Sequence, residues 1–148
     1  LVPSTLESIG ELNKSSGGLD YHFNDFMFDK AIEPAEEFHY AVLTKDILPG
    51  SRRKPFVAHN ELVESKGYEM PPVLDVVTAI LWENRRTGER LLGNNPETYT
   101  RCQEKIGVGT IIVGGFAPGG LGFAPGGLCV DPHYYDNDCL GVVGFRKF

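Results

Sequence analysis

The sequence predicts a single mainly-β domain, an antiparallel sandwich or barrel of about seven to nine short strands with one or two helices near the N-terminus. Short runs rich in Val, Ile, Thr and aromatic residues recur along the chain, and Gly and Pro separate most of them. A length of 148 residues suits one domain. We therefore expect one β-rich domain over 1–148, on which a helical or irregular segment, 1–36, packs.

The N-terminal segment contains the clearest helix signal. Ser4 and Glu7 have the spacing of a capping box, and apolar residues then follow at helical intervals. These features predict a short amphipathic helix over about 5–14. The aromatic stretch 19–28 fits a strand and a helix face equally well.

Strand signals dominate from Phe38 onward. Residues 38–43 alternate as a strand, and 54–63 is a weaker strand candidate. The run 73–82 is rich in β-branched residues but also carries a helical apolar stripe. We favour a strand there, because 84–92 resembles a hairpin loop in which Gly88 supplies the positive φ of a bulge.

Three further strands complete the expected sheet, at 99–106, 110–116 and 140–148. The longest apolar run, 107–116, has about half of the roughly 20 residues that a membrane helix needs. No membrane-spanning segment is therefore expected.

A perfect tandem repeat, GFAPGGL, occupies 115–121 and 122–128. Each copy contains Ala-Pro-Gly-Gly, which fits a type II turn. Surface loops tolerate such insertions because loop-closure entropy rises slowly with length. A passive duplication is the favoured interpretation. The alternative is a glycine-rich rim whose Phe116 and Phe123 cover a ligand.

The charge balance limits the classes of partner. Lys and Arg number 14 against 20 Asp and Glu, so the formal net charge is −6. Such a chain repels phosphate backbones, which argues against non-specific nucleic-acid binding. A small molecule, a glycan or a protein partner remains open. The apolar C-terminal run 140–145 could also add to the sheet of a second copy.

An acidic segment lies between Cys129 and Cys139. Its oxygen donors are of the kind that Ca²⁺ prefers, although the spacing is not that of an EF-hand. The candidate metal ligands are Asp131, His133, Asp136 and Asp138. Cys129 and Cys139 could close a disulfide and leave Cys102 as a free thiol; a reducing compartment would keep three thiols. The sequence leaves the compartment open, secreted or cytoplasmic.

Catalytic candidates are scattered. His39, His59, Cys102 and Glu104 could act as acid–base or nucleophilic groups, but no nucleophile-elbow or Cys–His signature surrounds them. A small buried apolar residue is the simpler role for Cys102. Whether the protein is an enzyme stays open at this stage.

Exposed loops offer the better-supported sites. Arg85 and Arg86 lie at the expected hairpin tip, and Tyr134 and Tyr135 lie in the acidic loop. Arg and Tyr are frequent energetic anchors at recognition surfaces. We therefore expect a ligand- or partner-binding β-scaffold that uses these residues and the duplicated glycine loop. The alternatives are a small β-barrel hydrolase or isomerase with an aromatic-lined pocket, and a subunit of a larger assembly.

Overall fold

The fold is mainly β with two helices, as the sequence predicts. It is known from a computed structural model that describes residues 5, 8, 21–23, 39–117, 127–133 and 137–148. Within these residues the chain forms seven strands and two helices. The helix expected over 5–14 lies almost wholly outside the described residues.

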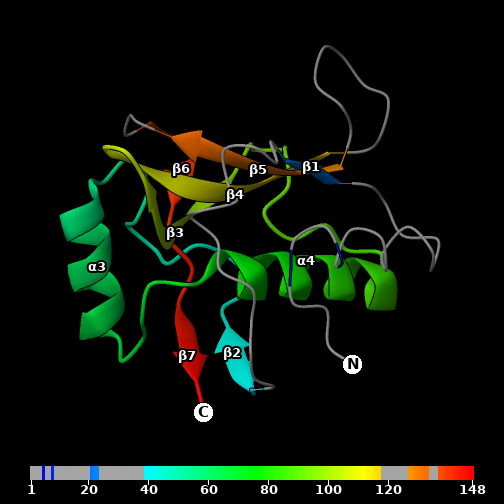
Figure 1. The fold of residues 1–148 in the computed structure, drawn as a ribbon, viewed down its shortest axis with the longest axis horizontal. Helices are drawn as coiled ribbons and strands as arrows, with labels where there is room; N and C mark the ends of the chain where they lie inside the picture. Colours follow the sequence, from blue (N-terminus) through cyan, green and yellow to red (C-terminus); the bar gives the residue numbers. More distant parts are fainter. Residues whose placement is uncertain (1–4, 6–7, 9–20, 24–38, 118–126, 134–136) are drawn as a thin grey trace.

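The larger sheet has five strands, in the order β1-β5-β4-β3-β6, and is curled (Figure 1). Its strands are β1 (Tyr21–Phe23), β3 (Tyr99–Ile106), β4 (Gly109–Ala117), β5 (Gly127–His133) and β6 (Leu140–Gly141). The central strand β4 runs antiparallel to both of its neighbours, β3 and β5. The two edge strands, β1 and β6, pair in parallel with β5 and β3.

A second, two-stranded sheet pairs β2 (Ala41–Leu43) with β7 (Phe145–Lys147) in antiparallel fashion. The single strand predicted over 140–148 is therefore wrong, because β6 and β7 belong to different sheets. Gly144 lies at the break, and a Cβ there would meet the ring of Tyr68 at 2.6 Å. The chain turns where only glycine fits.

Helix α4 (Val73–Thr87) replaces the strand and hairpin expected over this stretch. Its N-cap is Pro72, and Gly88 at φ 80° ends it in the left-handed conformation. Gly88 thus supplies the predicted positive φ, but as a helix cap. The apolar stripe outweighs the strand propensity of the β-branched residues, because it buries one face of a long helix. The buried stripe consists of Val73, Val76, Val77, Ile80 and Leu81.

Helix α3 (Phe56–Ser65) replaces the weaker strand candidate at 54–63. It begins after Pro55, and it buries His59 and Val63, which lie four residues apart and therefore share one helix face. The residues in between are exposed or only partly buried. A strand would have buried every second residue instead. The spacing of the buried residues is therefore that of a helix.

The main core lies between the larger sheet and α4 (Figure 1). Helix α3 covers a smaller cluster that contains Leu48, Val63, Met70 and Val142. Helix α4 contacts β2 as well as the large sheet. It therefore links the two sheets.

The duplicated segment connects β4 to β5. Gly115 has a φ of 57°, and the Tyr99 ring occupies the space that a Cβ would need. Phe116 near the start of the repeat and Leu128 at its end have no exposed surface. The two ends of the repeat are thus part of the sheet and its core, and 118–126 lie outside the described residues.

Candidate ligand-binding pocket

A pocket of about 190 Å³ lies between the small sheet and α4. Aliphatic side chains from both elements and from the segment after α4 make up most of its wall. The lining residues are Ala41, Leu43, Thr44, Lys45, Val76, Ala79, Ile80, Glu83, Leu91, Leu92 and Val143. The site is therefore an apolar hollow with charged side chains among its lining residues.

The helical spacing of α4 creates the hollow. Val76, Ala79, Ile80 and Glu83 follow one another at intervals of three, one and three residues, so they share one helix face. Ala79 has the shortest side chain of this row and leaves space that a larger residue would fill. Val76 and Ile80 are almost completely buried and form the floor.

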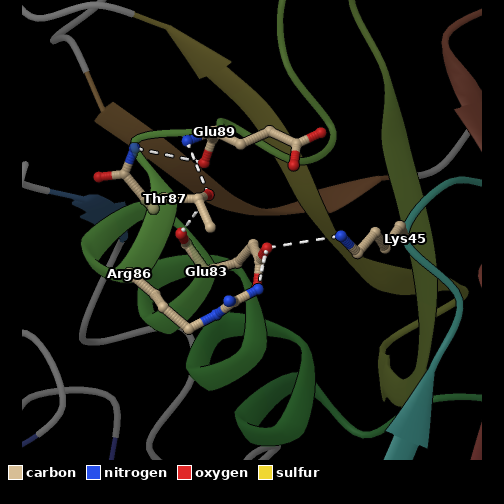
Figure 2. Close-up of polar contacts among 6 residues, drawn as sticks. Lys45, Glu83, Arg86, Thr87 and Glu89 are labelled. Atoms are coloured by element: carbon tan, nitrogen blue, oxygen red, sulfur yellow. Dashed lines mark hydrogen bonds and ion pairs between the residues drawn. The ribbon is translucent and has the colours of Figure 1, made fainter.

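Lys45, Glu83 and Arg86 form an ion-pair cluster beside the pocket (Figure 2). Arg86 donates from one guanidinium nitrogen to both Glu83 oxygens, at 2.8 and 3.0 Å. Lys45 Nζ lies 3.5 Å from Glu83 Oε1, and its side chain is 67% exposed. Glu83 is thus held mainly by Arg86, and Lys45 approaches it more loosely.

The end of α4 holds this cluster in position. Thr87 Oγ1 donates to the Glu83 carbonyl at 2.9 Å and accepts from the Glu89 N–H at 3.2 Å (Figure 2). The N–H of Gly88 closes the helix on the Asn84 carbonyl at 2.7 Å. The hydrogen bond from Arg86, supported by the charges of Arg86 and Lys45, lowers the pKa of Glu83. The carboxylate therefore stays ionised near neutral pH.

Arg85 and Arg86, predicted at a hairpin tip, lie in the last turn of α4. Both are exposed, and cations at this end of a helix are favourable for its macrodipole. The single tryptophan, Trp82, precedes Glu83 on the same helix and is 68% exposed. Of the two arginines, Arg86 contacts the pocket residue Glu83.

His39 and Glu104 each contact the first turn of α4, at the other end of the helix. His39 Nε2 lies 2.5 Å from Asp75 Oδ1, and both Glu104 oxygens lie 3.1 Å from the Val73 nitrogen. Burial, with a contribution from the charge of Asp75, raises the pKa of Glu104 to about 7. The two carboxylates and the imidazole surround the first turn of the helix.

His59 is fully buried in a polar contact between α3 and β3. Its Nδ1 accepts from Arg101 Nε at 3.1 Å, so its Nε2 carries the proton and donates to the Ser51 carbonyl at 2.6 Å. Arg101 also donates to Thr110 Oγ1 and to the Lys54 carbonyl. This network joins α3 to the sheet, and His59 has no exposed surface through which to reach a substrate.

All three cysteines are free thiols, instead of the disulfide considered for Cys129 and Cys139. Cys129 lies on β5 and Cys139 directly precedes β6, with β4 and β3 between these strands in the sheet. Three strand spacings of about 4.8 Å each exceed the roughly 7 Å limit for Cα atoms in a disulfide. Burial raises the pKa of both thiols, which makes them poor nucleophiles.

Cys102 is completely buried, and this burial raises the pKa of its thiol. Cys139 Sγ donates to Asn137 Oδ1 at 2.8 Å, and the Asn137 amide contacts His133 Nε2 at 3.1 Å. The amide thus stands between thiol and imidazole, so His133 does not accept the thiol proton. These contacts give neither cysteine the arrangement of a nucleophile beside its base.

Two of the candidate metal ligands of the acidic segment contact other side chains. His133 contacts Asn137, and Asp138 pairs with Arg53 at 3.3 Å. Within the described part of the chain, no three His, Cys, Asp or Glu side chains come together to hold a metal ion. Asp131 is described and Asp136 is not.

The remaining predicted binding residues divide into two groups. Phe116 is buried in the core and therefore presents no surface to a ligand. Phe123, Tyr134 and Tyr135 lie outside the described residues, and so does most of the duplicated loop. Among the described helices, none is both long and apolar enough to cross a membrane.

Comparison with known proteins adds no family: no protein-family model, curated protein or solved structure matches the chain. The pocket therefore rests on geometry alone. Sequence reasoning missed Lys45, Ala79 and Glu83. One signal could have found Glu83: it lies three residues before Arg86, a spacing at which two side chains form an ion pair on a helix.

Proposed function

We propose that the protein is a binding module that takes an apolar group into the pocket between β2 and α4. The observation that carries this proposal is the hollow of about 190 Å³, walled mainly by aliphatic side chains and flanked by charged ones. Binding sites combine an apolar wall with few polar groups that orient the ligand. The pocket has this composition.

The size of the pocket indicates what it can accept. An aliphatic cavity of about 150 Å³ in another protein is large enough for benzene, so this pocket suits one branched aliphatic group. It is smaller than the roughly 300 Å³ at which sites for drug-sized ligands begin. A single leucine-sized side chain, free or at the surface of a partner protein, fits best.

The thiol contacts support binding over nucleophilic catalysis. The pKa of each thiol is raised, and the Cys139 thiol gives its hydrogen bond to an amide oxygen. The exposed Trp82, next to Glu83 on α4, is a residue type that often anchors partners. It extends the proposed binding surface beyond the pocket.

The test is an NMR titration with N-acetyl-leucinamide, a neutral probe with one leucine side chain. At about 0.3 kcal/mol per heavy atom, a probe of about 12 atoms should bind with a millimolar Kd. We expect the largest shifts in the amide signals of Leu43, Lys45 and Ile80. Shifts that are absent there, or spread evenly over the surface, would contradict the proposal.

Substitution of Ala79 provides the matched control. Ala79→Leu extends a side chain into the hollow and should weaken binding of the probe about tenfold or more, because it occupies the same space. Thr78→Leu places the same leucine side chain at an exposed helix position that does not line the pocket, and it should leave binding unchanged. Circular dichroism verifies that both variants are folded.

A further inference from the structure

The two cations near the pocket, Arg86 and Lys45, contact Glu83 at different distances. Arg86 contacts both oxygens of Glu83 at 2.8 and 3.0 Å, whereas Lys45 stays 3.5 Å from one of them. Glu83 is 13% exposed and the Lys45 side chain is 67% exposed. The Arg86 contact is therefore the tighter one, and the ammonium group of Lys45 keeps room for another acceptor.

The other polar residue of the lining is already engaged. Thr44 Oγ1 donates to the Asp46 carbonyl at 2.8 Å and accepts from the Gly144 N–H at 2.9 Å. An ammonium group has three donors, and Lys45 directs one contact to Glu83. Lys45 is consequently the lining residue best placed to donate to a ligand at the edge of the apolar hollow.

The two charged lining residues differ in how they can meet a ligand. Glu83 is held by Arg86, whereas Lys45 is the exposed cation of the lining. A cation at the edge of an apolar hollow favours ligands that combine an apolar part with a negative charge.

Resting on the proposed function, we infer that the ligand of this pocket is an aliphatic carboxylate: its branched chain fills the hollow and its carboxylate meets Lys45. The same chemistry occurs in a free branched-chain acid and at a peptide C-terminus that ends in leucine. In both, a carboxylate lies a few bonds from an aliphatic group, and the pocket likewise places Lys45 beside an aliphatic wall.

The experiment compares two probes of the same size and side chain, N-acetyl-leucine, which ends in a carboxylate, and N-acetyl-leucinamide, which ends in a neutral amide. The acid should bind about two- to five-fold more tightly than the amide, the range for a solvent-exposed ion pair. High salt should narrow this ratio because it screens the charge contact. Equal affinity of acid and amide at low salt would overturn the inference and leave the proposed function intact.

The decisive variant is Lys45→Met, which keeps an unbranched apolar stem and removes the charge. We expect the acid-to-amide ratio to fall to about one, because the charge that distinguishes the two probes has lost its partner. Lys66→Met, which removes an exposed charge after α3, should keep the ratio of the unmodified protein. A ratio that survives in Lys45→Met would overturn the inference.

Two further measurements distinguish a free acid from a peptide C-terminus as the ligand. They also show whether a failure concerns the proposed function or only this inference. 4-Methylpentanoate represents the free acid, and a pentapeptide that ends in leucine represents the C-terminus of a partner; the tighter of the two identifies the source. Failure of every probe to bind, or binding unaffected by Ala79→Leu, would overturn the proposed function together with this inference. Loss of the charge preference alone overturns only the inference.

Discussion

At the N-terminal end of α4, the Glu104 carboxylate accepts from the Val73 N–H, and at the C-terminal end the Glu83 carboxylate accepts from Arg86. The helix macrodipole favours a negative charge at the first end and disfavours it at the second. The pKa values shift in the opposite sense: that of Glu104 rises to about 7 and that of Glu83 is lowered.

Burial and neighbouring charges explain the difference. Glu104 is partly withdrawn from water and feels the negative charge of Asp75, which itself contacts His39. Glu83 has two cations within 3.5 Å. Desolvation and close counter-charges therefore outweigh a dipole that is worth only about 0.3–1 kcal/mol at a helix end. The N-terminal end is suited to a structural role, and the C-terminal end can exchange partners.

The largest expected effect concerns Glu104. Its carboxyl holds a proton up to about pH 7 in the folded protein, against an ordinary pKa of 4.5. The unfolded chain therefore releases the proton first, and folding stability should fall by about 3 kcal/mol as the pH rises from about 4.5 to 7. Urea denaturation across this range measures it. Glu104→Gln keeps an acceptor for the Val73 N–H and should remove most of this slope; an unchanged slope would show that other groups cause it.

Gly88→Ala tests the C-terminal end with a smaller effect. Gly88 has a φ of 80°, and an added Cβ would meet no atom within 4 Å, so the cost is backbone strain alone, about 1 kcal/mol. Gly67→Ala after α3 is a matched control, with a φ of 78° and equally open space. Both should lower the urea midpoint alike, but only Gly88→Ala should weaken acid binding at the pocket. If both variants affect binding equally, the helix cap at Gly88 does not act on the pocket and the prediction is wrong.

The smallest effect on stability is expected for Glu83→Gln. Because the pKa of Glu83 is lowered, the carboxylate contributes to folding stability above pH 4.5, and this contribution is lost as the pH falls below that value. Thermal melts at neutral pH should change little, since the Arg86 and Lys45 contacts are screened by solvent. Binding of N-acetyl-leucine should instead strengthen about twofold, because both cations are released for the ligand. Weaker binding would contradict the division of roles between Arg86 and Lys45.

Much of the fold could be predicted from short-range patterns. The strands over 99–106 and 110–116 alternate or run apolar between clear turns, and the structure has them as β3 and β4. The stretch 73–82 carries two patterns at once, β-branched residues and a helical stripe. Local propensity cannot choose between them, since burial against the sheet decides the outcome.

The candidate site was less predictable than the fold. Arg85 and Arg86 are easily recognised in the sequence as charged residues. Their place on a helix, however, depends on whether the preceding stretch, 73–82, folds as a strand or as a helix. Ala79 shows no signal of its own, because a small residue becomes a hollow only when larger neighbours surround it. Lys45 has no motif around it, and its relation to Glu83 is a matter of packing.

The sequence by itself determined the mainly-β class, the positive φ at Gly88 and the strands β3 and β4, because these depend on backbone restrictions and side-chain alternation within a few residues. Only the tertiary structure decided that α4 is a helix and that Lys45 lies beside Glu83, 38 positions later in the chain. Such contacts arise when an apolar face is buried, and the residues that meet there are chosen by the packing of separate elements.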